Sequence, residues 1–173
     1  TIDDALAAAA LLQARQEIDP AQVYIAGHSL GAMLAPRIAA QTDELAGIIL
    51  LAPAARHLED LMLEQSTYLA QSDGTLDRNE QKDLDTLKVL VDQIKELPET
   101  EKIDTETPIL GAAPAYWLDL LAYDPVATAA NLSLPILILQ GERDYQVTMT
   151  DFGMFQSALG GKDNVIMKSY PTL

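Results

Sequence analysis

One short motif in this sequence could supply a nucleophile. Gly27-His28-Ser29-Leu30-Gly31 follows a run of β-favouring residues and precedes a helical pattern. In that setting a G-x-S-x-G motif is typical of a serine held at the apex of a tight strand-to-helix turn. We expect both glycines to be needed, because strand and helix then approach without a clash. The turn would expose the Ser29 hydroxyl at the carboxyl edge of a sheet, where the N–H of Leu30 points toward a developing oxyanion. The alternative is that Ser29 is only a helix cap.

A carboxylate that orients a catalytic base is expected from a later part of the chain. Asp144 follows the apolar run Ile136-Leu137-Ile138-Leu139 after a short loop. Loops at the carboxyl ends of parallel strands gather functional groups at one edge of a sheet, so Asp144 is the first choice for the acid. The alternative is a turn aspartate that bonds its own backbone. Glu142 and Asp151 are weaker candidates, because Glu142 is expected in solvent and Asp151 is explained as a helix-start residue.

The base is harder to place, although a serine hydroxyl needs a neighbouring group to take its proton. The sequence contains two histidines, His28 and His57. His28 adjoins Ser29, and successive side chains in a tight turn diverge, so a hydrogen bond between the two is unfavourable. His57 precedes Asp144, whereas the chain order for this motif is serine, acid, histidine. We therefore predict that the histidine lies just beyond Leu173, with His57 as the alternative.

Helical and strand patterns alternate around these residues. Strands are predicted at residues 23–26, 47–52, 136–139 and 164–170, and their apolar runs are typical of buried parallel strands. The fold class is therefore α/β, a parallel sheet joined by right-handed crossovers. Roughly 80 residues separate the second and third strands, more than a crossover needs, and they contain amphipathic helical patterns. We predict a partial α/β core in residues 1–53 and 124–173, and a helical cap insertion in residues 54–123.

Composition argues against several classes of function. The 173 residues carry a formal net charge of −15, so nucleic-acid phosphates and anionic membrane surfaces would repel the chain. The sequence lacks cysteine, which excludes thiolate chemistry and disulfides. Its apolar runs are far shorter than the roughly 20 residues of a membrane-spanning helix. Residues 71–80 echo half of a calcium loop, but Leu69 stands where the first carboxylate ligand is needed. We expect neither a metal nor a cofactor.

The chain is expected to be part of a longer protein. It opens with Thr1-Ile2-Asp3-Asp4, a capping pattern that leads straight into a helix, and it stops at Pro171-Thr172-Leu173, directly after a predicted strand. The strand at 23–26 would then have an exposed apolar edge, which favours association. We expect this edge either to pair with a second copy or to be covered within a longer chain. A lost N-terminus would also have removed any secretion signal, so the compartment is left open.

The chain resembles the α/β-hydrolase superfamily, in particular bacterial esterase-like and dienelactone-hydrolase-like members. The resemblance rests on residues 27–33, on the stretch 135–147 and on the closing Lys168-Ser169-Tyr170-Pro171. It implies the latter half of that fold, strands five to eight with a cap, with Ser29 as nucleophile, Asp144 as triad acid and Leu30 as one oxyanion donor. The implied activity is hydrolysis of small carboxylic esters, or of thioesters or amides, through an acyl-enzyme. Without its base, this chain alone would be nearly inactive. The alternatives are a serine peptidase of the same fold and a non-catalytic binding relative.

Overall fold

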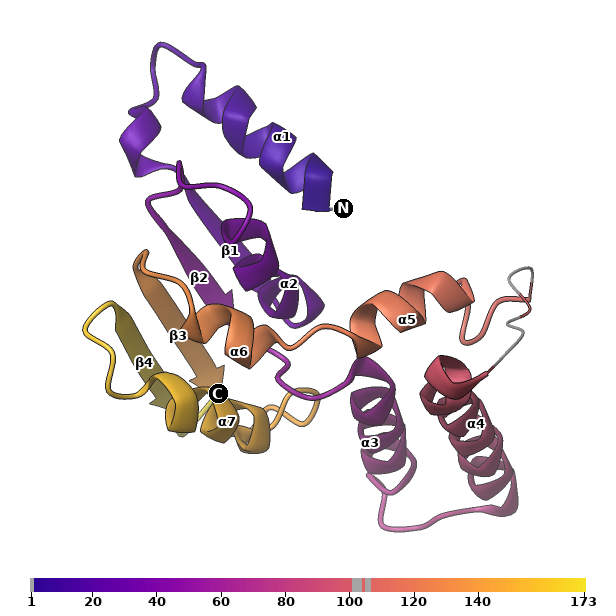
Figure 1. Cartoon of the computed structure of the whole chain (residues 1–173). Coiled ribbons are helices and arrows are strands. Elements are labelled where there is room, and N and C mark those ends of the chain that lie inside the picture. Colours follow the sequence, from indigo (N-terminus) through magenta and orange to yellow (C-terminus); the bar gives the residue numbers. More distant parts are fainter. Residues whose placement is uncertain (1, 101–103, 105–106) are drawn as a thin grey trace. The chain divides into compact units, whose positions relative to one another are not determined.

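The computed structural model describes residues 2–100, 104 and 107–173, and it divides into two compact units (Figure 1). Unit 1 comprises residues 1–55 and 124–173, and unit 2 comprises residues 56–123. Thr1, the expected cap of the first helix, lies outside the described residues. So do residues 101–103 and 105–106 of the acidic stretch in unit 2. Unit 1 is thus built from two separate stretches of sequence.

Unit 1 contains a four-stranded parallel sheet within the described residues, which confirms the predicted fold class. Its strands, β1 (Tyr24–His28), β2 (Gly47–Leu51), β3 (Ile136–Gly141) and β4 (Val165–Tyr170), pair in that order. The register places His28 beside Leu51 and Leu51 beside Leu139. Because all four strands run the same way, the segments that follow them emerge at one edge of the sheet.

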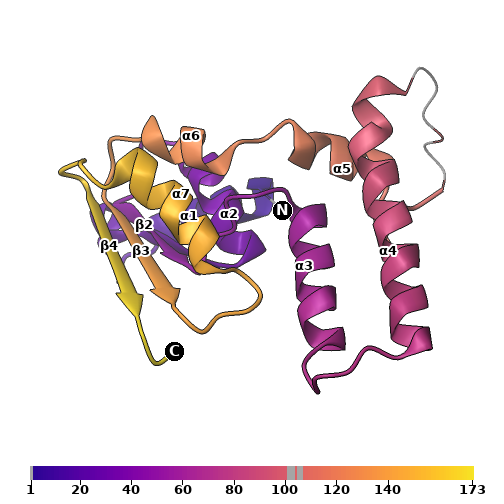
Figure 2. The same ribbon diagram turned by 90° about the horizontal axis from the view of Figure 1, so that it is seen from below.

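Helices α1 (Ile2–Gln13), α2 (Leu30–Ala39), α6 (Pro125–Ala130) and α7 (Met149–Leu159) belong to the same unit, with a short 3-10 turn η1 (Pro20–Gln22). Helix α2 packs on β1 and β2, and α6 contacts both α2 and α7 (Figure 2). The core lies under these helices, where alternate residues of the two central strands are buried; Ile48, Leu50, Ile136 and Ile138 are all 2% exposed or less. On the alternate strand positions Tyr24 and Ile166 are 48% and 67% exposed. The alternation shows which face of the sheet the helices cover.

Two helices of unit 1 begin at capping residues that the sequence alone did not single out. Helix α7 is capped by Thr148, whose hydroxyl accepts the N–H of Thr150. Asp151, which was explained as a helix-start residue, lies in the first turn of this helix. Helix α6 was not predicted, although Asp124-Pro125 is a strong start signal: Asp124 accepts the N–H of Ala127 at 2.8 Å, and proline suits the first helical position.

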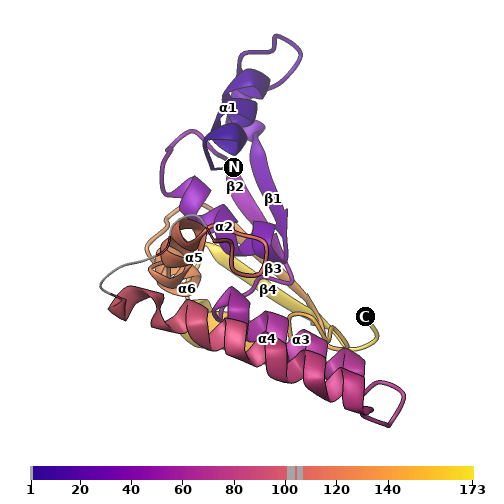
Figure 3. The ribbon, with the colours of Figure 1, turned by 90° about the vertical axis from the view of Figure 1, so that its right-hand side faces the viewer.

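Unit 2 is helical, with α3 (Leu58–Ala70), α4 (Arg78–Glu96), η2 (Leu97–Glu99) and α5 (Pro114–Leu121). Helices α3 and α4 contact each other, and Figure 3 shows the length of α4, which has 19 residues. Helix α4 begins with a capping box in which Asp77 and Glu80 bond each other's backbone N–H groups. Trp117 is buried in this unit and donates its indole N–H to the carbonyl of Ile109 at 2.8 Å. In the described residues there is no helix long and apolar enough to cross a membrane.

Candidate active site

Ser29 lies between β1 and α2 in a strained backbone conformation. Its φ of 53° and ψ of −117° fall in a region that side chains with a Cβ rarely adopt. The N–H of Ser29 donates to the carbonyl of Leu51 at 3.0 Å, and the carbonyl of Ser29 accepts the N–H of Met33 at 2.9 Å. The residue is therefore held from β2 on one side and from α2 on the other, which is how a strained conformation persists in a folded protein.

The side chain of Ser29 does not behave as a helix cap. Ser29 occupies the N-cap position of α2, but its hydroxyl makes no capping hydrogen bond. This finding removes the alternative that the residue serves only to start the helix. Leu30 is the first residue of α2, so its N–H belongs to the group of N-terminal donors that lack a partner inside the helix. A hydroxyl and backbone donors are thus next to each other at the start of α2.

The two glycines of the motif have unequal roles, contrary to the expectation that both are needed. A Cβ on Gly27 would lie 2.2 Å from the carbonyl oxygen of Gly31 and 2.6 Å from the N of Ala32, both backbone atoms. A Cβ on Gly31 would meet no heavy atom of the described chain within 4 Å. The contact between strand and helix is therefore made at Gly27, whose missing side chain admits the first turn of α2. Gly31 supplies the backbone that fills this space.

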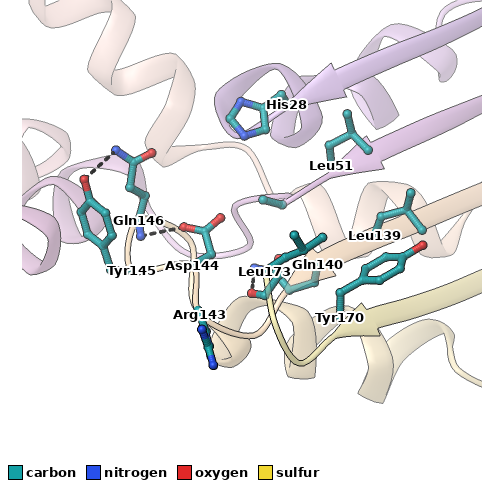
Figure 4. Close-up of a pocket in the computed structure, with 12 residues that line it drawn as sticks. His28, Leu51, Leu139, Gln140, Arg143, Asp144, Tyr145, Gln146, Tyr170 and Leu173 are labelled. Carbon is teal, nitrogen blue, oxygen red and sulfur yellow. Dashed lines mark hydrogen bonds between the residues drawn. The ribbon is translucent and has the colours of Figure 1, made fainter.

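Asp144 lies on the loop between β3 and α7 and is half-buried. Its Oδ1 accepts the N–H of Gln146 at 2.8 Å (Figure 4). The same oxygen accepts the N–H of Val147 at 3.2 Å. The alternative of a turn aspartate that bonds its own backbone is therefore present in the structure. These bonds use only one of the two carboxylate oxygens, because none of the described residues hydrogen-bonds Oδ2. One oxygen fixes the orientation of the side chain, and the other is left to accept a further donor.

Ser29 and Asp144 follow strands that end at the same edge of the sheet. Ser29 comes directly after β1 and Asp144 three residues after β3, with β2 between the two strands. Two strand spacings separate β1 from β3 by roughly 10 Å, too far for direct contact between the two side chains. The neighbour of Ser29, His28, lines a cavity of about 730 Å³ together with Asp144, Tyr145 and Tyr170 (Figure 4). The cavity therefore extends from the neighbour of Ser29 to the Asp144 carboxylate.

The other candidate residues are placed as follows. His28 is exposed at the end of β1. His57 is the N-cap residue of α3 in unit 2, where its carbonyl accepts the N–H of Leu61 at 3.2 Å. Glu142 is exposed, and its Oε1 accepts the hydroxyl hydrogen of Ser169 at 2.7 Å. Neither of these positions identifies His28 or His57 as the catalytic base.

Two buried polar residues near the site were missed or underrated by the sequence analysis. Asp151 is fully buried, and its Oδ1 accepts the N–H of Ala55 at 2.9 Å. Its role as a helix-start residue is correct, but its partner lies 96 residues away in the chain, which no local pattern could reveal. Gln140 is 1% exposed on β3. Its signal was available, because Ile136 and Ile138 precede it at the alternate positions that form the buried face.

The described residues contain no group of three His, Asp or Glu side chains arranged to hold a metal ion. What the site offers is a hydroxyl in a strained turn, backbone donors beside it and a carboxylate with one open oxygen. These are the parts that nucleophilic acyl chemistry uses.

The parallel sheet and the turn between β1 and α2 have the arrangement of an α/β-hydrolase, and the comparisons with known proteins place this chain in that class. The family described as serine aminopeptidase S33 matches residues 1–173, and the chain belongs to that family. Esterase EstD of Thermotoga maritima is 41% identical over 164 residues, which are 95% of this chain and 37% of that esterase. The chain thus spans little more than a third of this curated relative.

Solved structures share the fold at low sequence identity. Est1E from Butyrivibrio proteoclasticus has a TM-score of 0.61 at 18% identity, over 98% of this chain and 58% of that protein. The acylaminoacyl peptidase of Pyrococcus horikoshii has a TM-score of 0.60 at 14% identity, over 99% of this chain and 23% of that protein. The fold is therefore common to proteins named as esterases and to proteins named as peptidases.

Proposed function

We propose that the protein is a serine hydrolase that cleaves carboxylic esters of small molecules through an acyl-enzyme on Ser29. The hydroxyl oxygen of Ser29 attacks the ester carbonyl while a base removes its proton, and the alcohol leaves with that proton. Water then attacks the acyl-enzyme and releases the carboxylic acid. The N–H of Leu30 stabilises the oxyanion in both steps. Thioesters and amides are further substrates that the same chemistry permits.

The observation that carries this proposal is the backbone of Ser29. A non-glycine residue at a φ of 53° costs free energy, on the order of 1–3 kcal/mol. Here the strain is accompanied by a hydroxyl that caps no helix. A strained residue whose hydroxyl makes no capping bond supports a chemical role for that hydroxyl, because strain of this kind gathers at functional sites. The relation to esterase EstD supports the choice of an ester as substrate.

Asp144 is proposed as the acid that orients the base. An imidazole placed between β1 and β3 would reach both the Ser29 hydroxyl and Oδ2 of Asp144, since the two strands are roughly 10 Å apart. The segment after β4 supports the prediction that this histidine follows Leu173. Arg143 donates its N–H to the carbonyl of Leu173 at 2.6 Å, and the carbonyl of Leu173 would lie 3.0 Å from a Cβ on Gly141. Residue 173 is therefore beside the loop that carries Asp144.

A serine peptidase is the second candidate. The family description names an aminopeptidase, and one structural neighbour is an acylaminoacyl peptidase. The two candidates share the nucleophile and the acyl-enzyme and differ in the leaving group, an alcohol for an ester and an amine for a peptide. A panel of p-nitrophenyl esters and aminoacyl p-nitroanilides, tested on the full-length protein, separates them by the ratio of their kcat/KM values.

Covalent labelling tests the proposal directly. A fluorophosphonate probe should label the full-length protein at Ser29, and Ser29→Ala should remove the label. Labelling at another serine, or none at all, would refute the assignment. Residues 1–173 alone should react on the order of 10⁴-fold more slowly if the base lies beyond Leu173. Rapid labelling of residues 1–173 that is lost in His57→Ala would instead make His57 the base.

A further inference from the structure

Gln140 is a buried amide at the end of β3, on the face of the sheet that packs against the helices. The residues that precede it on this face, Ile136 and Ile138, are 2% and 0% exposed, and Gln140 itself is 1% exposed. Its Oε1 is buried without a hydrogen-bond partner among the described residues. An unsatisfied buried acceptor is unfavourable, whereas a leucine in this position would leave none. A polar residue here therefore needs a reason other than packing.

The amide nitrogen of Gln140 provides that reason. Its Nε2 donates to the carbonyl of Val147 at 2.8 Å and to the carbonyl of Gly141 at 3.0 Å. These carbonyls stand at the two ends of the loop from residue 141 to residue 147. The reverse orientation of the amide would set Oε1 against two carbonyl oxygens, so the donors must face the loop. Gln140 thus holds the loop closed from the inside.

Both residues that Gln140 bonds also bond Asp144. The carbonyl of Gly141 accepts the N–H of Asp144 at 3.3 Å, and the N–H of Val147 donates to Oδ1 of Asp144 at 3.2 Å. The backbone and the carboxylate of Asp144 are therefore each fixed through a residue that Gln140 holds. The described hydrogen bonds of the Gln140 side chain go to the two carbonyls and not to the Asp144 carboxylate.

We propose that Gln140 is a positioning residue for Asp144, which fixes the direction of Oδ2 through the closed loop. The inference rests on the proposed function, in which Oδ2 orients the catalytic histidine. Without the amide donors, the loop would relax and the carboxylate would lose its fixed direction. A displacement of about 1 Å in a catalytic group lowers the rate on the order of 100-fold. The effect should appear in kcat and not in KM. Gln140 lines the cavity together with Asp144, but the residue is only 1% exposed and its amide donates to the carbonyls of the loop.

The test uses the full-length protein and p-nitrophenyl acetate. Gln140→Met should lower kcat about 10- to 100-fold and leave KM within about 3-fold. Gln140→Glu keeps the shape of the side chain but loses the amide donors, so it should lower kcat to a similar degree. Ile138→Val, a conservative change on the same buried face, serves as the control for general loss of stability and should leave kcat unchanged. Equal losses of kcat in the control and in Gln140→Met would overturn the proposal.

A double-mutant cycle distinguishes the positioning of Asp144 by Gln140 from a general structural effect of the Gln140 variant. If Gln140 acts through Asp144, then Gln140→Met should change kcat by less than about 3-fold when Asp144→Ala is already present. A loss of the same size in both backgrounds would contradict a role through Asp144. The comparison distinguishes the two roles, because a purely structural effect would lower kcat by the same factor in both backgrounds.

A further measurement does not depend on activity or on a variant. The side-chain N–H protons of Gln140 and the backbone N–H groups of Gln146 and Val147 should exchange slowly with solvent in the wild-type protein. Fast exchange of these protons refutes the closed loop, even if the Gln140 variants fail to fold. If Ser29 is not labelled and no ester is cleaved, the proposed function fails. Slow exchange would then still support the loop restraint, whereas the catalytic role would be rejected.

Discussion

Replacement of Gly27 by alanine tests the closest contact in the serine turn. The new Cβ would lie 2.2 Å from the carbonyl oxygen of Gly31 and 2.4 Å from its carbonyl carbon, where ordinary contacts begin at 3.4 Å. Because these are backbone atoms, a rotamer change cannot relieve the clash, and α2 must move away from β1. Overpacking in a core typically costs about 1–3 kcal/mol, and here we expect about 3 kcal/mol or more. In a chain of this size each kcal/mol lowers Tm by about 2–4 °C.

Gly31→Ala is the matched control for this prediction. A Cβ on Gly31 meets nothing within 4 Å in the described chain, and alanine favours a helix over glycine by up to about 1 kcal/mol. Urea denaturation should therefore show a large loss of stability for Gly27→Ala and none for Gly31→Ala. Gly27→Ala should also slow labelling of Ser29, because the hydroxyl moves with the turn. Equal stability of the two variants would refute the reasoning about the turn.

Three further changes follow from the structure. Ser29→Gly should be about 1 kcal/mol more stable than Ser29→Ala, because glycine relieves the strain at a φ of 53°; similar urea midpoints would deny that strain. Asp151→Ala should lower the free energy of unfolding by about 2 kcal/mol, since it leaves the buried N–H of Ala55 without its acceptor. Asp151→Asn should lower it less. A larger loss for Asp151→Asn than for Asp151→Ala in chemical denaturation would contradict this. The Asp60 carboxylate hydrogen-bonds the ammonium of Lys95 and raises the pKa of that lysine above 10.5. The pair is partly exposed, so Lys95→Met should cost below about 1 kcal/mol at neutral pH, and the difference from wild type should vanish as the pH rises through the raised pKa; a difference that persists there contradicts the assignment.

The order of strands and helices could be predicted because each element carries its own signal. The apolar runs that became β2 and β3 are buried on a parallel sheet, and the serine motif marks the turn between β1 and α2. Thr148, the cap of α7, was not singled out because Asp151, in the first turn of the same helix, is also a typical helix-start residue. Helix α6 has six residues, too few to show a periodic pattern.

The details of the site depend on contacts that sequence spacing does not encode. That Gly27 and not Gly31 makes the close approach follows from the direction in which each Cβ would point. The partner of Asp151 is a backbone N–H far away in the chain. Asp144 was found because it follows a strand, but the division of labour between its two oxygens needed coordinates. Local patterns thus located the candidate residues, and long-range contacts decide how each is held.

The pairing of β2 with β3 has an evolutionary consequence. The chain leaves unit 1 after residue 55 and returns to it at residue 124. Leu51 and Leu139 lie on either side of this insertion in the sequence, yet they are direct neighbours in the sheet. A segment inserted between two paired strands can be lengthened, shortened or exchanged between genes without loss of a hydrogen bond between those strands. Changes of length within residues 56–123 should therefore leave the pairing of β2 with β3 intact.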